Sequence, residues 1–423
     1  MHDVSGKPPS APADGPPRRP FAVLTVAAAT FTVVTSEMLP VGLLTPIGAS
    51  LDVGAGTAGW TLTVTGLVAA VSAPFVPRAV GRADRRTALV ALMLLLAAAN
   101  LLAAWAPNFP VLVGARVLVG LGMGGVWTLA AGLAPRLVPP ASVGAATSLV
   151  FSGIAVASVL GVPLGTYLQA LAGWRAAFAA AAGLAVAVAA AMAVLLPRLP
   201  AGRAPRRDAR TAAHPIARPS VRTGLVITAL LVTGHFAVYT FVRPVLEESA
   251  GLGPGAVGTL LLAYGLAGVA GNFVAGLRAP GAPRATLAVL AGGLACAVVL
   301  VPAFGTTLAG AAVLMVAWGL AYGGVSVGAQ TWLMASAPGD TERATALFVG
   351  VFNGAIALGA FAGGLVMDGP GGVPYLGAAL AAAALLTALA GRAPDAARSG
   401  PADDRHPAGP AHRSSTSSEA GPA

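Results

Sequence analysis

Twelve apolar stretches separated by mostly short connections run along this chain of 423 residues. Each is long enough for a membrane-crossing helix, which needs about 20 mostly apolar residues. Arginine occurs in every second connection and is nearly absent from the others. Because positively charged loops stay on the cytoplasmic side, this alternation predicts an even number of crossings with both ends of the chain cytoplasmic. The predicted spans are residues 21–48, 57–77, 87–106, 109–132, 144–169, 175–196, 223–246, 255–277, 285–304, 307–334, 344–367 and 372–391.

The arginines that orient the spans lie in five connections, and further arginines lie in both terminal segments. Those of the connections are Arg78, Arg82, Arg85, Arg86, Arg136, Arg198, Arg203, Arg206, Arg207, Arg210, Arg218, Arg222, Arg278, Arg284 and Arg343. The opposite connections carry acidic residues instead, namely Asp52, Glu247, Glu248 and Asp368, with Arg175 as the main exception. We therefore expect a multi-pass protein of the plasma (cytoplasmic) membrane.

Composition excludes several other classes. Hydrophobic residues make up 56% of the chain and charged residues 9%, whereas a soluble domain carries roughly a quarter charged residues. The net charge of +10 lies in loops and tails, where anionic lipid is a better partner than nucleic acid. The single cysteine, Cys296, excludes a disulfide within the chain. The single lysine, Lys7, excludes a Walker-A phosphate loop in any span or connecting loop. We expect no metal and no cofactor.

A central basic segment divides the spans six and six. The halves resemble each other weakly: Phe151-Ser152-Gly153 opens the apolar part of the fifth span, and Phe352-Asn353-Gly354 that of the eleventh. Such parallel repeats are typical of carriers with a site between two bundles. The predicted organisation is a disordered N-terminus (1–20), a six-helix bundle (21–196), a basic cytoplasmic linker (197–222), a second six-helix bundle (223–391) and a disordered tail (392–423).

Small residues form a stripe in the fifth span. Gly153, Ala157, Gly161 and Gly165 recur every fourth residue, so they share one helix face that lets another backbone approach closely. Pro163 within this stripe removes a helical hydrogen bond and permits a bend. Plain helix packing explains the stripe, and the sliding contact of a moving carrier explains it as well.

Glu37 is the only acidic residue deep inside a span. A charge there costs a few kcal/mol, so it is a candidate functional residue. It could handle protons, or it could be neutral and only hydrogen-bond to a neighbouring helix. Pro40 should loosen the helix just after it and free backbone carbonyls. Arg116 in the fourth span is the matching cation, unless its side chain extends to the interface.

The seventh span carries a polar stripe. His235, Tyr239 and Arg243 are four residues apart, so they share one helix face, and three polar residues on one face indicate a wet cavity. His235 could also titrate near neutral pH. Arg243 could instead be held by Glu247 near the outer surface, as a gate. The remaining candidate residues of a substrate cavity are Trp127, Gln330 and Asn353.

These motifs resemble the major facilitator superfamily over about residues 20–392, in particular its twelve-span drug/proton antiporter group with arabinose-efflux-like permeases. The matching segments are T-S-E-M-L-P-V-G at 35–42, A-R with two following glycines at 115–122, G-V-P-L-G-T at 161–166, G-W-R-A-A-F at 173–178 and G-H-F-A-V-Y at 234–239. The resemblance implies an all-α membrane fold of two six-helix bundles and a transporter rather than an enzyme.

One loop departs from the family pattern. The family sequence after the second span is G-x-x-x-D-R-x-G-R-[RK], and its aspartate helps to latch the cytoplasmic gate. This chain has Gly81 at that aspartate and Asp84 at the second glycine, and it retains Arg82, Arg85 and Arg86. Asp84 is therefore a candidate substitute for the latch.

The leading hypothesis is a proton-driven exporter of a small organic molecule such as a drug, sugar or nucleoside. Glu37 would exchange a proton for the substrate, and Arg116 would tune the pKa of Glu37. The polar residues of the seventh span would line the path from the opposite half. Uptake by proton symport uses the same physics, and a non-transporting membrane sensor or scaffold is the alternative from another class. We expect the substrate, protons and the lipid bilayer as partners, and a monomer.

Overall fold

The computed structural model describes residues 20–73, 75–81, 83–130, 133–200, 215–338, 340–367, 369, 372–392 and 394. These residues form helices joined by short connections, and no strand occurs among them. The predicted disordered segments 1–20 and 392–423 and most of the predicted linker lie outside this description, apart from a few residues at their edges.

Eleven helical stretches of the described chain are long and apolar enough to cross a membrane, and the twelfth is shorter. This helix, α14 (Pro283–Val299), ends at Leu300 and is followed directly by α15 (Val301–Phe304). Pro302 lacks the N–H that a continuous helix would need there. Together α14 and α15 cover the predicted ninth span, so the prediction of an all-α, twelve-span membrane protein is confirmed.

The helices fall into two groups in chain order. The first group contains α1 (Pro20–Met38), η1 (Leu39–Gly42), α2 (Leu44–Leu51), α3 (Ala55–Ala58), α4 (Trp60–Ser72), α5 (Val76–Val80), α6 (Arg85–Ala104), α7 (Phe109–Ala130), α8 (Ala134–Leu137), η2 (Pro140–Ser142), α9 (Val143–Ala172) and α10 (Trp174–Leu195). The second contains η3 (Pro215–Ala217), α11 (Pro219–Tyr239), α12 (Val242–Ala250), α13 (Pro254–Arg278), α14, α15, α16 (Leu308–Gly323), α17 (Val325–Ser336), α18 (Thr341–Val366) and α19 (Gly372–Ala390).

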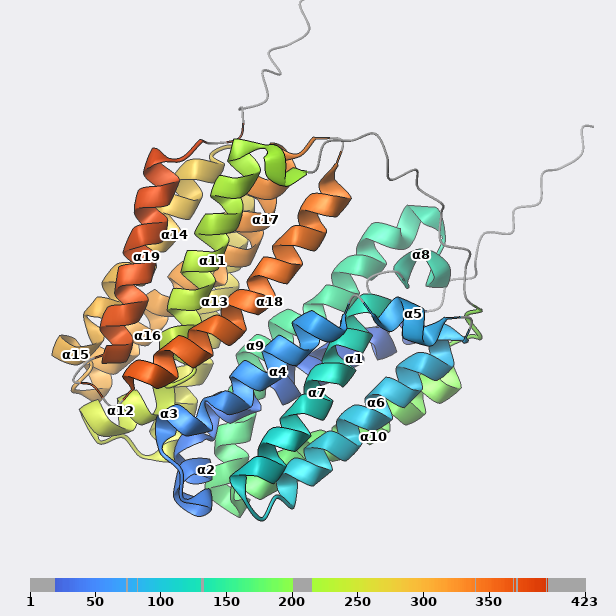
Figure 1. Ribbon diagram of the computed structural model, residues 1–423, viewed down its shortest axis with the longest axis horizontal. Coiled ribbons are helices and arrows are strands. Elements are labelled where there is room, and N and C mark those ends of the chain that lie inside the picture. The colour runs from blue at the N-terminus through green and yellow to red at the C-terminus, as the bar shows by residue number, and fades with distance from the viewer. Residues whose placement is uncertain are drawn as a thin grey trace, which may run out of the picture.

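The two groups lie side by side as separate bundles, the first in blue to green and the second in yellow-green to red (Figure 1). They converge at the end where α2, α3 and α12 lie and diverge toward the end that carries α5, α8 and the start of α11. Two helix pairs, α9 with α13 and α4 with α18, make most of the contact between the bundles. The converging end carries the arginine-poor connections, and the diverging end carries the arginine-rich ones.

The first, seventh and tenth spans, like the ninth, change from one helix to another along their length. The first changes at Pro40 from α1 to the 3₁₀ turn η1. The seventh changes from α11 to α12 at Thr240 and Phe241, because Pro244 has no N–H to give to the carbonyl four residues earlier. The tenth changes from α16 to α17 at Gly324. These three interruptions lie close in sequence to Glu37, Tyr239 and Tyr322, which belong to the site described below.

The small-residue face of α9 packs directly on α1. A side chain on Gly153 would collide with the backbone of Ala27 and the hydroxyl of Thr30, and one on Gly161 would press on Thr35. Gly165 of the same face lies against Leu39. The contact therefore runs past Glu37 and fixes the part of α1 that carries it.

Replacing Gly153 by alanine should lower the thermal stability of the protein in detergent. The added methyl group meets a backbone carbonyl that cannot move aside, and such overpacking costs about 1–3 kcal/mol. The control is Gly183→Ala in α10, where an added methyl meets nothing and better helix propensity should give a slight gain. Equal unfolding temperatures for the two variants would contradict the packing described here.

Candidate functional site

Glu37 lies near the C-terminal end of α1, just before the interruption at Pro40. Its side chain is only 5% exposed. The carboxylate atom Oε1 is buried and has no hydrogen-bond partner among the described residues. A buried polar atom without a partner costs about 1–3 kcal/mol, and more when it is charged. Such an arrangement is more typical of a functional site than of a stabilising contact.

Arg116 of α7 donates hydrogen bonds to backbone carbonyls around Glu37 and none to the Glu37 carboxylate atom Oε1. Its guanidinium donates to the carbonyl oxygen of Ser36 at 2.8 Å, to that of Glu37 at 2.9 Å and to that of Thr61 in α4 at 3.1 Å. Proline has no N–H, so Pro40 leaves the Ser36 carbonyl without its helical donor. Arg116 supplies that donor, and its side chain is fully buried instead of extending to the interface.

The same arginine is close enough to the Glu37 carboxyl to interact with it electrostatically. One buried cation therefore braces three carbonyls from two helices and stabilises negative charge on the neighbouring acid. In a low-dielectric interior such an interaction is stronger than at the surface. The two residues that the sequence singled out in the first half thus lie together, with the backbone as the link between them.

His235 forms the centre of an aromatic cluster in the second half. Trp318 of α16 donates its Nε1–H to His235 Nδ1 at 2.9 Å, and the Tyr264 hydroxyl of α13 lies 3.4 Å from His235 Nε2. Since Nδ1 accepts a hydrogen bond, the neutral imidazole carries its proton on Nε2. Tyr322 stacks on the imidazole with ring centroids 3.3 Å apart and planes 8° from parallel, and Tyr239 stacks at 4.9 Å and 21°.

Two members of this cluster, Tyr264 and Tyr322, were not among the residues predicted from sequence. They come from α13 and α16, far from His235 along the chain. One signal was available: the chain has only five tyrosines, and Tyr239, Tyr264 and Tyr322 all fall inside predicted spans of the second half. Scarce aromatic residues in separate spans of one bundle can meet in its interior.

The cluster faces the site of the first half. The hydroxyl of Tyr322 is close enough to the Glu37 carboxyl to interact with it electrostatically. That hydroxyl is buried and, like Glu37 Oε1, has no hydrogen-bond partner among the described residues. Each half therefore contributes one buried polar atom without a partner among the described residues, and the two groups lie within electrostatic range of each other.

Arg243 lies apart from this cluster, at the converging end of the bundles. It belongs to α12, so the break at Thr240 and Phe241 separates it from His235 and Tyr239, which both lie in α11 and stack on each other. The Arg243 guanidinium pairs with Glu247 at 2.8 Å. It also donates to the Gly42 carbonyl at 2.5 Å and to Gln169 Oε1 at 2.9 Å. Arg243 thus ties the second bundle to η1 and α9 of the first.

A second contact closes the same end. Gly56 of α3 approaches the Gly364 carbonyl of α18 so closely that a side chain at position 56 would not fit. The buried Phe241 ring lies against Gly59 and Gly363, again one residue from each bundle. Backbone contact and a wedged aromatic ring thus accompany the Arg243 bonds at the arginine-poor end.

The other predicted cavity residues lie on α7, α17 and α18. Trp127 of α7 is half-buried and packs against two clusters of buried apolar residues. Gln330 of α17 is half-buried. Asn353 of α18 donates to the carbonyl of Val349 in its own helix at 2.8 Å.

Asp84 connects two segments of the first half. Its Oδ1 caps α6 by accepting from the Arg86 backbone N–H at 2.8 Å, and it also accepts from the Leu199 backbone N–H at 2.9 Å. The Arg85 backbone N–H donates to the Leu199 carbonyl, and the Arg86 guanidinium donates to the Ala193 carbonyl. These bonds tie the start of α6 to the end of α10 and its continuation. Arg82 lies outside the described residues.

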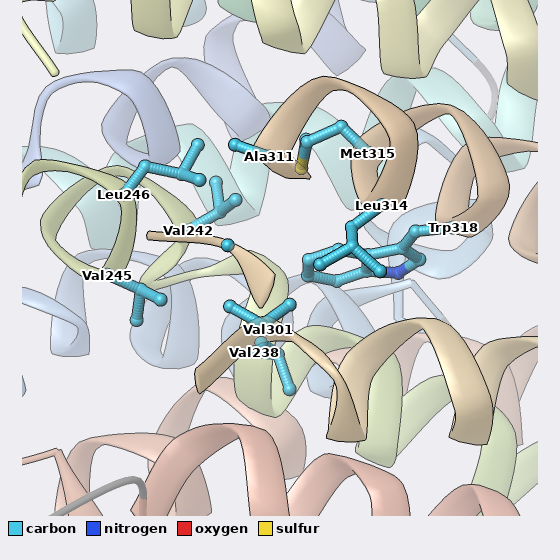
Figure 2. Close-up of a pocket in the computed structure, with 10 residues that line it drawn as sticks. Val238, Val242, Val245, Leu246, Val301, Ala311, Leu314, Met315 and Trp318 are labelled. Carbon is cyan, nitrogen blue, oxygen red and sulfur yellow. The ribbon is translucent and has the colours of Figure 1, made fainter. Parts of the chain in front are cut away.

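A small apolar pocket lies in the second half, between α11, α12, α15 and α16. Figure 2 shows its lining of aliphatic side chains, with Trp318 at one side. Because almost no polar surface lines it, the pocket offers no group that could orient a polar ligand. Trp318 thus separates this pocket from the aromatic cluster around His235.

Comparison with known proteins relates these features to a family. Residues 26–360 match the model of the Major Facilitator Superfamily. The purine ribonucleoside efflux pump NepI of Escherichia coli strain K12 is 33% identical over 350 residues, which cover 83% of this chain and 88% of that protein. NepI of Escherichia coli O1:K1 is 32% identical over the same shares of the two chains.

Solved structures show the same fold at low sequence identity. A peptide transporter POT superposes with a TM-score of 0.73 and 14% identity, covering 89% of this chain and 95% of that chain. A bacterial homolog of the human lysosomal transporter Spinster, inward-facing and unoccupied, gives 0.62 and 16%, covering 88% and 95%. With the family model matching most of the chain, this protein belongs to the major facilitator superfamily and is a membrane transporter for a small molecule, not an enzyme.

Proposed function

We propose that this chain is a proton-driven exporter of a small organic molecule, working by alternating access between its two bundles. Purine ribonucleosides are the substrate class to test, because the relatives at 32–33% identity are named purine ribonucleoside efflux pumps. The protein would act as a monomer in the plasma membrane, with both termini in the cytoplasm.

The observation that carries the proposal is the buried Glu37 carboxylate with its unpartnered Oε1. A charged carboxylate inside a membrane span costs free energy, and ionisable residues in spans are typical of functional sites such as proton relays. Glu37 can accept a proton from one side of the membrane and release it when the interface opens to the other. Arg116 places a positive charge beside this carboxyl, and its hydrogen bonds fix the backbone that carries it.

The arrangement of the bundles supports alternating access. Arg243 and the close contact between α3 and α18 hold the bundles together at the arginine-poor end, while the other end diverges (Figure 1). By the positive-inside rule the diverging end faces the cytoplasm. Export would then begin with substrate entering from the cytoplasm and proceed through opening of the Arg243 contacts.

The aromatic cluster supports a substrate with a flat ring. Stacked aromatic residues with a few polar atoms bind nucleobases and similar heterocycles through their π faces. The cluster around His235 contains such rings, and the hydroxyl of its Tyr322 lies within electrostatic range of Glu37. A sugar without a ring of this kind would use little of the cluster.

Replacing Glu37 by glutamine should abolish proton-coupled transport and leave the protein folded. Inside-out vesicles with an acidic lumen should accumulate labelled inosine when they contain the wild-type protein. Vesicles with Glu37→Gln should accumulate no more than protein-free vesicles, because glutamine has the shape of the acid but does not titrate.

The matched control is Glu248→Gln, which removes an exposed acid on α12. It should retain the wild-type accumulation. Undiminished pH-driven accumulation by Glu37→Gln would remove Glu37 from the mechanism.

Arg116→Lys should reduce transport at least about tenfold, since a charged group that loses its hydrogen bonds costs about 1.5–3 kcal/mol. Lysine keeps the charge but lacks the planar fork that reaches carbonyls on both α1 and α4. Arg284→Lys is the control, because Arg284 also donates to a carbonyl, that of Ala388, at 2.9 Å but lies outside the site. Equal transport by Arg116→Lys and wild type would show that charge alone matters.

Cysteine accessibility should give the orientation. In a Cys296→Ala background, a membrane-impermeant maleimide added to intact cells should label Glu248→Cys at the arginine-poor end. It should label Thr341→Cys, exposed at the start of α18, only after permeabilisation. The reverse pattern would invert the proposed topology.

A further inference from the structure

We propose that the ring of Tyr322 occupies, in this structure, the place that a planar heteroaromatic ring of the substrate takes when it binds. The ligand class is a neutral heterocycle with N–H or O–H donors at one edge, as in a purine nucleoside. This inference rests on the proposed function and deepens it. It assigns the position at which the substrate ring binds, here called the seat, and it names Tyr322 as the side chain that vacates this position.

The stacking geometry marks Tyr322 as the layer that covers His235. Its ring lies almost parallel to the imidazole, at a centroid separation of 3.3 Å. Aromatic side chains usually prefer offset or edge-on contacts with centroids 4.5–7 Å apart. Tyr322 therefore overlaps the histidine face as a bound heterocycle would, whereas Phe236 and Trp318 meet His235 edge-on.

The rest of the cluster is fixed in place. Trp318 bonds to His235 Nδ1, Tyr264 lies at Nε2, and Tyr239 stacks at 4.9 Å. All four of these residues are buried, with between 1% and 8% of each exposed. They form a preformed wall whose polar groups around the imidazole are already engaged.

Tyr322 differs from that wall in two respects. It is only half-buried, and its hydroxyl is enclosed without a hydrogen-bond partner among the described residues. An unsatisfied buried hydroxyl costs about 1–3 kcal/mol. Moving the Tyr322 side chain therefore breaks no hydrogen bond among the described residues, whereas moving His235, Trp318 or Tyr264 breaks at least one.

The backbone beside Tyr322 cannot accompany such a movement. Gly323 and Gly319 of α16 approach the carbonyls of Gly268 and Tyr264 in α13 so closely that no side chain fits between the helices. Displacement must therefore be a rotation of the tyrosine side chain. The helix that carries Trp318 stays in place, so the wall survives the exchange.

Across the interface, Glu37 provides the polar partner for a ring in this seat. Its unpartnered Oε1 can only accept when ionised, so it selects a ligand edge with an N–H or O–H donor. The Glu37 carboxyl lies within electrostatic range of the Tyr322 hydroxyl, so a polar group of a ligand bound in place of this ring would feel the charge of the carboxylate. A donor on the substrate would satisfy the acid that Tyr322 leaves unsatisfied.

The test is equilibrium binding of inosine and of ribose to the purified full-length protein by calorimetry. Wild type should bind inosine and not ribose. Tyr322→Ala should bind inosine about three- to tenfold more tightly, because removing a competitor for the seat raises the fraction of binding-competent protein. Tyr322→Phe should behave as wild type, since the stacked ring is retained, and so should Tyr375→Ala, which alters an exposed tyrosine on α19.

His235→Ala should weaken inosine binding at least tenfold, because it removes the imidazole on which the substrate ring would stack rather than the Tyr322 ring that competes with the substrate. If Tyr322→Ala is too unstable to purify, Tyr322→Leu removes the stackable ring and keeps most of the volume. Weaker binding by the Tyr322 variants, comparable to that of His235→Ala, would overturn the inference by making Tyr322 part of the wall. Equal affinities for ribose and inosine would contradict the proposal that a heteroaromatic ring of the substrate binds against His235.

These failures are distinguishable from failure of the proposed function. If wild-type vesicles accumulate inosine under a proton gradient but the Tyr322 variants bind it more weakly, only the inference falls. If wild type neither binds nor accumulates inosine, the purine substrate class falls together with the seat. If inosine accumulation does not depend on the pH gradient but the variants bind inosine as expected, the proposed ring position stands and the proposed proton coupling fails.

Discussion

Everything at the site depends on how one buried guanidinium compensates for one proline. Pro40 interrupts the first span and leaves the carbonyl of Ser36 without its helical donor. Arg116 donates to that carbonyl, to the next one and to a third in α4. Without this brace the interruption would leave backbone acceptors unsatisfied in a membrane interior, where each costs several kcal/mol. With it, the chain can hold an acid at the bundle interface.

The brace also divides the tasks of the two halves. The first half presents a titratable carboxylate on a rigid backbone, fixed from behind by the tight packing of α9 on α1. The second half presents aromatic faces around His235, fixed by hydrogen bonds and by the close α13–α16 contact. Between the halves, the bonds of Arg243 close one end. Substrate and proton would thus meet at a surface to which both bundles contribute, which is the arrangement that rocking bundles require.

Much of this could be predicted from the sequence because it follows from local rules. Span lengths and arginine placement determine the topology, and Glu37 stands out as an acid in an apolar helix. The shared face of His235 and Arg243 could not be trusted, because helical periodicity fails when Pro244 ends the ladder between them. Asp84 likewise was a candidate substitute for the gate latch although it stands at a glycine of the family motif, and in this structure its Oδ1 accepts hydrogen bonds from backbone N–H groups of its own bundle.

That Tyr264 and Tyr322 join His235 and Tyr239 in one cluster was not predicted from the sequence, and the reason is physical. His235, Tyr264 and Trp318 lie on three helices, and their contact is set by how α11, α13 and α16 pack. The glycines that bring α16 against α13 look the same in sequence as glycines that face open space, such as Gly183 and Gly350. Local pattern identifies which residues are unusual, whereas packing decides which of them meet.

The central claim is that the Glu37 carboxyl changes its ionisation during transport. Infrared difference spectroscopy of the carboxyl C=O stretch, recorded with and without substrate and assigned by its loss in a Glu37 variant, measures this directly. We expect the protonated-carboxyl band of Glu37 to decrease when substrate binds and to return when the substrate is removed at acidic pH. A band assigned to Glu37 that does not respond to substrate, or the absence of any titrating band from this residue, would contradict the account.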